Sequence, residues 1–151
     1  MDNTRSVQMT AEERSEFLGT GGTGVVSFPQ GDEEPPYSFP VSYGYDEIDD
    51  EFYLRLAFGP DTEKGGLGVD GSRVSLVVYD QTDDGWRSVV ATGRLVEATE
   101  AAIDSDVVQA MQRIHIPLVD VFERHPRELN FRFFTLSVDG VSGRKEARSA
   151  D

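Results

Sequence analysis

The segment Tyr37–Gly66, YSFPVSYGYDEIDDEFYLRLAFGPDTEKGG, decides how the rest of the chain is interpreted. Its first nine residues alternate between large apolar and small side chains, with Tyr37, Phe39, Val41, Tyr43 and Tyr45 on one face and Ser38, Pro40, Ser42 and Gly44 on the other. After the acidic turn DEIDD, the alternation resumes, with Phe52, Leu54, Leu56 and Phe58 opposite Tyr53, Arg55 and Ala57. A period of two is typical of β-strands, so the segment predicts a hairpin of two strands.

The remaining sequence predicts four more strands and a few short helices. The further strands are expected at residues 23–28, 73–80, 86–97 and 130–141. Thr10 and Glu13 have the spacing of a capping box, which predicts a short helix that ends at Gly19. Other short helices are expected just after Pro60 and within residues 101–123. Gly93 indicates a bulge inside its strand.

The connections between successive strands decide the architecture. Most of them are turns too short for parallel crossovers, so the sheet is expected to be mostly antiparallel. Six strands in a chain of 151 residues favour a small closed or half-open barrel over a flat sheet with two exposed edges. The prediction is a single domain, mainly β with short helices, that has a short N-terminal helix and a polar C-terminal tail from about residue 142.

The charge balance narrows the set of partners. The chain carries 28 acidic and 14 basic residues, a formal net charge of -14, and contains no cysteine. A polyanion such as nucleic acid, or an anionic membrane surface, is a poor match for this charge. The absence of cysteine excludes disulfides and thiolate chemistry. The N-terminus is polar and no apolar run approaches a membrane span, so a cytoplasmic location is expected.

The basic residues are also unbalanced in type. Only Lys64 and Lys145 are lysines, and the other twelve are arginines. An acidic, lysine-poor surface suggests a halophilic protein, because high salt screens self-repulsion. The alternative is an acidic cytosolic protein from a GC-rich genome. Equal unfolding stability in dilute buffer and in molar potassium chloride would contradict the halophilic hypothesis.

Several apparent motifs carry little chemistry. Gly19, Gly21 and Gly24 spell G-x-G-x-x-G, but a helix precedes them and a strand follows, the reverse of a dinucleotide-binding unit. They are expected to form a helix stop and a loop. His115 and His125 lack a metal-ligand pattern, and no serine lies in a nucleophile elbow. No metal site and no catalytic residue is therefore assigned.

Two cations in the opening segment have a geometry that suits an anion. Arg55 lies in mid-strand, where its planar fork matches a phosphate. Lys64 follows just before an expected helix start, and the glycines after it allow backbone N–H groups to approach an anion. The alternative is that Arg55 pairs with an acidic neighbour such as Glu51 or Glu63 while Lys64 is solvated. Spacing alone leaves both interpretations open.

The order of these segments resembles a known family. PVSYGYDEIDDEFYLRLAFGPDTEKGGL, then RVSLVVYD, WRSVVATGRLVE and FFTLSVDGVSGRK, is similar to the FMN-binding split-barrel proteins related to pyridoxamine 5'-phosphate oxidase. The resemblance covers residues 10 to 145. It implies a six-stranded antiparallel split barrel that forms a homodimer, with FMN bound in clefts between the subunits and a small molecule as substrate.

The resemblance also implies roles for individual residues. Pro40, Val41, Ser42 and Tyr43 would border the flavin ring, and Arg55 and Lys64 would hold the phosphate. Trp86 and Ser88 of the partner subunit would close the cleft. The true oxidase has further basic and histidine residues near its C-terminus that grip the substrate phosphate. Here Arg144 and Lys145 either contribute to such a grip or belong to a solvated tail, so vitamin B6 oxidation is not expected.

The expected function is therefore a flavin-dependent oxidoreductase with an unidentified substrate. Two alternatives stay open on the same scaffold. One is a member that binds a deazaflavin or haem, and the other is a non-catalytic flavin-binding module.

Overall fold

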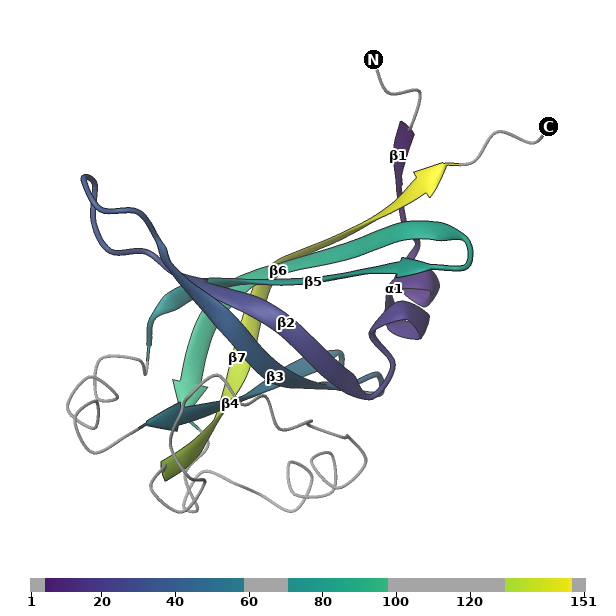
Figure 1. Cartoon of the computed structure of the whole chain (residues 1–151). Coiled ribbons are helices and arrows are strands. Elements are labelled where there is room, and N and C mark those ends of the chain that lie inside the picture. The colour runs from purple at the N-terminus through teal and green to yellow at the C-terminus, as the bar shows by residue number, and fades with distance from the viewer. Residues whose placement is uncertain (1–4, 59–70, 98–129, 148–151) are drawn as a thin grey trace.

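The computed structural model describes residues 5–58, 71–97 and 130–147 (Figure 1). Its elements in chain order are β1 (Arg5–Gln8), α1 (Ala11–Leu18), β2 (Gly21–Phe28), β3 (Tyr37–Asp46), β4 (Glu51–Phe58), β5 (Arg73–Thr82), β6 (Gly85–Glu97) and β7 (Asn130–Ala147). Each of the six predicted strands is present, with boundaries that differ from the predicted ones by a few residues.

Six of the strands close into a barrel. Their order is β7-β4-β3-β2-β5-β6, and β6 pairs back with β7 to complete the ring. All of these pairings are antiparallel. The predicted fold class, a six-stranded antiparallel barrel, is confirmed. Closure leaves the barrel strands without the free edges of an open sheet.

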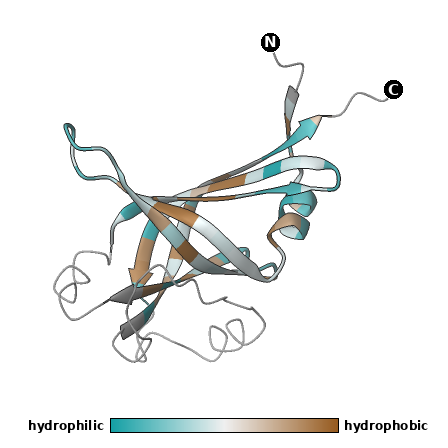
Figure 2. Ribbon diagram, viewed as in Figure 1, coloured by the Kyte–Doolittle hydropathy of each residue, from teal (hydrophilic) through white to brown (hydrophobic). Residues whose placement is uncertain are grey.

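The inward faces of the strands form one apolar core. The alternation predicted for residues 37–45 and 52–58 is visible in it, because Val41, Tyr43, Phe52, Leu54 and Leu56 are all buried. Leu76, Leu95, Phe134 and Leu136 complete the centre. Figure 2 shows the hydrophobic positions in the middle of the strands and hydrophilic ones at the hairpin ends. Burial of each large apolar side chain contributes about 1.5–3 kcal/mol.

Helix α1 begins and ends where the sequence predicts. Thr10 and Glu13 form the capping box, with the Glu13 N–H donating to Thr10 Oγ1 at 3.2 Å and the Thr10 N–H to Glu13 Oε1 at 3.0 Å. Gly19 follows the helix with φ of 61°, a conformation that glycine adopts without steric cost. The hydroxyl of Tyr43 donates to the Leu18 carbonyl at 3.1 Å, which fixes the helix end to β3.

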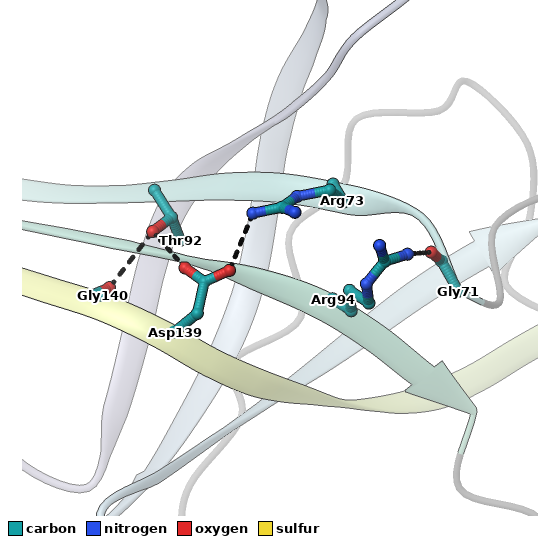
Figure 3. Close-up of polar contacts among 6 residues, drawn as sticks. All are labelled: Gly71, Arg73, Thr92, Arg94, Asp139 and Gly140. Atoms are coloured by element: carbon teal, nitrogen blue, oxygen red, sulfur yellow. Dashed lines mark hydrogen bonds and ion pairs between the residues drawn. The ribbon is translucent and has the colours of Figure 1, made fainter.

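A bulge interrupts the pairing of β6 with β7. The register shifts between Thr92 and Gly93, as the glycine predicted. A Cβ atom at Gly93 would lie 2.0 Å from the Ser137 carbonyl oxygen, so only glycine fits there. Beside the bulge, Asp139 accepts hydrogen bonds from Thr92 Oγ1 at 2.8 Å and Arg73 Nη2 at 2.9 Å (Figure 3). These bonds join β5, β6 and β7 on the outside of the barrel.

Three predictions differ from the structure. The polar tail expected from about residue 142 is a continuation of β7 to Ala147. Its pairing partners are the start of β6 and a seventh strand, β1, which the polar N-terminal sequence did not indicate. Gly21 lies in β2 rather than in the loop expected before residue 23, whereas Gly24 lies in the strand expected there, and a Cβ atom at Gly24 would lie 2.9 Å from the Val77 carbonyl oxygen of β5.

Other predictions fall outside the described residues. These are the helices expected after Pro60 and within residues 101–123, together with Lys64, His115 and His125.

Candidate functional site

The ring-bordering residues predicted on β3 divide between its two faces. Val41 and Tyr43 are each 3% exposed and belong to the core, so only their backbone can meet a ligand. Burial raises the pKa of Tyr43 to about 12, so its hydroxyl stays neutral. Ser42 lies on the outward face and is also 3% exposed, whereas Pro40 is exposed.

Arg55 lies beside Ser42. The two residues are directly opposite each other in the β3–β4 ladder, and directly opposed side chains share a face. Arg55 is partly buried. Glu51, one of the carboxylates considered as its partner, accepts a hydrogen bond from the Tyr53 hydroxyl at 2.8 Å. Burial, and next this hydrogen bond, raise the pKa of Tyr53. Phosphate binding and an acidic partner both stay predictions for Arg55.

The other two predicted residues, Trp86 and Ser88, line a pocket at the end of the β5–β6 hairpin. The pocket has a volume of about 540 Å³. Its lining is Ser6, Tyr79, Trp86, Arg87, Ser88, Arg144, Lys145 and Glu146, and we call it the hairpin pocket. Three strands and the extra strand β1 therefore contribute to it, and it depends on the part of β7 that the sequence predicted as a tail.

The hairpin pocket combines aromatic rings with positive charge. The rings of Tyr79 and Trp86 have centroids 6.4 Å apart and an interplanar angle of 35°. Lys145 bonds Glu13 of α1, and Arg144 Nη1 donates to Ser6 Oγ at 2.9 Å. The sequence indicated neither Tyr79 nor Arg87. The sequence nevertheless contained a signal for this region. Arg87, Arg144 and Lys145 are three of the 14 basic residues of this acidic chain, and they lie in two short segments of β6 and β7 that pair with each other.

The two groups of predicted residues lie far apart in one chain. On β7, Arg55 is opposite Phe133 and Ser88 is opposite Arg144, eleven residues further along. At a rise of about 3.3 Å per residue, these positions are up to about 35 Å apart along the strand. In Figure 1, β7 runs from beside β4 at one end of the molecule to β1 at the other. The structure brings Ser42 and Arg55 together, and separately Trp86 and Ser88.

Searches for other kinds of site give negative results within the described ranges. No group of three or more histidine, cysteine, aspartate or glutamate side chains there is arranged to hold a metal ion. In the same part of the chain, no helix has the length and apolar character that crossing a membrane requires.

The class of fold is now defined: a small closed barrel of six antiparallel strands, with one capped helix at its N-terminal end. The sequence pattern of the pyridoxamine 5'-phosphate oxidase family matches residues 10–145. The chain belongs to this family. The resemblance noted in the sequence is thereby confirmed over the same residues.

Solved structures support the same fold. A FAD-binding protein from Mesorhizobium loti has 23% identity and a TM-score of 0.65, with 97% of this chain and 100% of that chain covered. A FAD-binding protein from Mycobacterium smegmatis has 13% identity and a TM-score of 0.65, with 93% and 99% covered. A FAD- and haem-binding protein from the same organism has 14% identity and a TM-score of 0.59, with 97% and 75% covered. No curated protein matches the chain.

Proposed function

We propose that the protein is a flavin-dependent oxidoreductase that binds FMN between two copies of the chain. The observation that carries the proposal is the direct opposition of Ser42 and Arg55 on the outer face of β3 and β4 in a chain of this family. A hydroxyl and a guanidinium side by side suit the polar side of a phosphorylated flavin. A bound flavin supplies the redox chemistry, while the protein binds and orients it.

The proposed roles follow from the face of β3 on which each side chain lies. Pro40 offers an exposed surface to the ring, Val41 and Tyr43 offer backbone groups, and Ser42 offers its hydroxyl. Arg55 holds the phosphate. Lys64 joins it in this proposal on the strength of the family resemblance, since its position is outside the described residues.

The separation along β7 supports the proposal of a homodimer. Trp86 and Ser88 are too far from Arg55 in one chain for all three to contact one FMN molecule. A second copy related by a two-fold axis would bring its hairpin pocket to the Arg55 face of the first, and symmetry would create two equivalent sites. In each site, Trp86 and Ser88 are then residues of the partner subunit.

The alternatives of a haem or deazaflavin cofactor and of a non-catalytic module have distinct signatures. The FAD- and haem-binding protein from M. smegmatis keeps haem among the candidates on this fold. An absorption spectrum and mass identification of the molecule that co-purifies separate flavin, deazaflavin and haem. Turnover of a reduced nicotinamide with an artificial acceptor separates an oxidoreductase from a binding module. The physiological substrate is proposed to be a small molecule.

The test of the phosphate contacts compares FMN with riboflavin, which lacks the phosphate. Arg55→Ala combined with Lys64→Ala should weaken FMN binding by about 10²- to 10⁴-fold, since each of the two charged hydrogen bonds contributes about 1.5–3 kcal/mol, and leave riboflavin binding unchanged. Arg73→Ala, which removes a cation beside the bulge, is the matched control and should retain FMN. Undiminished FMN affinity in the double variant would refute the proposed contacts.

A further inference from the structure

The outer face of β2 carries an exposed hydroxyl beside the residues proposed to bind the phosphate. Thr23 of β2 is directly opposite Ser42 of β3, which is directly opposite Arg55 of β4. Directly opposed residues share a face of the sheet, so these three side chains form one row across three strands, which we call the polar row. Neighbouring strands lie about 4.8 Å apart, so Thr23 is roughly 10 Å from Arg55.

The pairing of β2 explains why Thr23 is exposed whereas Ser42 is buried. Ser42 has a paired residue on each side. β5 pairs with β2 only from Val25 to Ser27 and then departs from it, so Thr23 has no paired residue on the β5 side (Figure 1). Within the described part of the chain, the Thr23 hydroxyl makes no hydrogen bond, so it is available to a ligand.

An apolar row lies next to the polar row on the same face. Side chains alternate between the two faces of a strand, so Val25, two residues from Thr23, also lies on the outer face. Val25 is directly opposite Pro40 of β3 and Val77 of β5. Pro40 is exposed, and the two valines are half-buried. These three side chains form a shallow uncharged surface, and a flat aromatic ring gains free energy by covering it.

We infer that β2 provides the seat of the flavin ring, with the ring on Val25 and Pro40 and a polar atom of its edge hydrogen-bonded to Thr23. The inference rests on the proposed function, which assigns the phosphate to Arg55. An extended ribityl phosphate covers about two strand spacings, so a phosphate at Arg55 leaves the ring above β2 and β3. The flavin then lies across the strands, and its ribityl hydroxyls pass over Ser42.

Two flavins separate a contact with the ring from a contact with the phosphate, because riboflavin has the ring and the ribityl chain of FMN without the phosphate. Thr23→Val keeps the β-branched shape and removes the hydroxyl. It should weaken the binding of both flavins equally, by about 3- to 10-fold, the value of one neutral hydrogen bond. Thr23→Ser keeps the hydroxyl and should bind both flavins as the wild type does. Calorimetry measures each affinity.

Thr92→Val is the matched control, since Thr92 is an exposed threonine on β6. It should bind both flavins as the wild type does. The visible absorption spectrum of the bound flavin gives a second readout, because a hydrogen bond to the edge of the ring changes its electronic transitions. At saturating FMN, Thr23→Val should shift this spectrum, whereas Thr23→Ser and Thr92→Val should leave it unchanged.

The outcomes separate this inference from the proposed function. A wild-type protein that binds no flavin contradicts the proposed function and the inference together. If the wild type binds FMN while Thr23→Val binds both flavins normally, or loses affinity for FMN alone, the seat on β2 is overturned and the proposed function stands. An equal loss in Thr23→Val and Thr23→Ser would also overturn it, because the hydroxyl would then not be the contact.

Discussion

Two groups of arginines occupy opposite ends of β6 and differ in how their donors are satisfied. At the bulge, Arg73 pairs with Asp139, and Arg94 donates to the Gly71 carbonyl at 3.1 Å (Figure 3). In the hairpin pocket, Arg87 keeps a buried Nε atom without a partner, and Arg144 is bonded to a hydroxyl. Within the described chain, each arginine of the first group has an oxygen acceptor, whereas one buried donor of the second group has none.

The comparison shows what a structural arginine looks like in this fold. Arg73 and Arg94 are directly opposite each other in the β5–β6 ladder, an arrangement that repels, and each has found its own oxygen acceptor. Arg87 has only a 3.7 Å ion pair with the exposed Asp84, and its buried Nε atom has no acceptor. Incomplete polar groups are characteristic of sites that a ligand completes, because stability is lost there in the absence of the ligand.

The largest effect on this comparison should come from Gly93→Ala. The added Cβ atom would lie 2.0 Å from the Ser137 backbone oxygen, and a backbone group cannot move away cheaply. We expect a loss of about 3 kcal/mol in the free energy of unfolding, together with displacement of Asp139 from Arg73. Gly140→Ala is the control, since its Cβ atom would meet only Thr92 Oγ1 at 3.2 Å. Urea denaturation measures both, and equal stability of the two variants would contradict the packing at the bulge.

The next effect has the opposite sign. Arg87→Met replaces the unsatisfied donor with an apolar chain of similar length, so it should stabilise the ligand-free protein by about 1 kcal/mol. Thermal and urea unfolding in the absence of ligand provide the measurement. A destabilised Arg87→Met protein would indicate that Arg87 is a satisfied structural residue, like Arg73.

A smaller loss is expected for Asp139→Ala. This change removes the acceptor of Arg73 and Thr92, but both donors are exposed and can bond water. The expected cost is about 0.5–1 kcal/mol in urea denaturation. A loss of more than about 2 kcal/mol would contradict the exposed, water-accessible bonding of Arg73 and Thr92.

The smallest effect concerns pH and the link between α1 and β7. A hydrogen bond from Lys145, and then one from the Thr10 backbone, lower the pKa of Glu13 from 4.5 to about 2. Because the folded pKa is depressed, the stabilisation from Glu13 is complete above pH 4.5 and is lost as the pH falls toward 2. In Glu13→Gln, this part of the acid-induced loss of stability should disappear. Identical pH profiles for wild type and variant would contradict the assigned contact.

Much of the barrel was predictable because its signals are local. The alternation from Tyr37 to Phe58 predicted the β3–β4 hairpin, Thr10 and Glu13 predicted the helix cap, and Gly93 predicted the bulge. Each of these depends on a few neighbouring side chains and on the periodicity of one element.

The hairpin pocket was only half predictable, for a physical reason. β1 and the last residues of β7 are polar, and they become strands because they pair with each other across most of the chain length. Propensity within one segment carries no information about such a partner. Arg144 and Lys145 therefore resembled a tail, and Arg87 gave no signal until β7 was placed beside it. The opposition of Ser42 and Arg55 was predictable from the hairpin. The separation of Arg55 from Ser88, eleven residues along β7 or up to about 35 Å, was not.

The central claim is that one flavin site needs two copies of the chain, and mixing two defective variants tests it most directly. Arg55→Ala and Trp86→Ala should each retain little FMN alone. After joint unfolding and refolding, half of the dimers are mixed and each has one intact site, so about one quarter of the wild-type FMN binding should return. If the mixture binds no more FMN than the average of the two variants, the two residues do not act in a shared site across subunits.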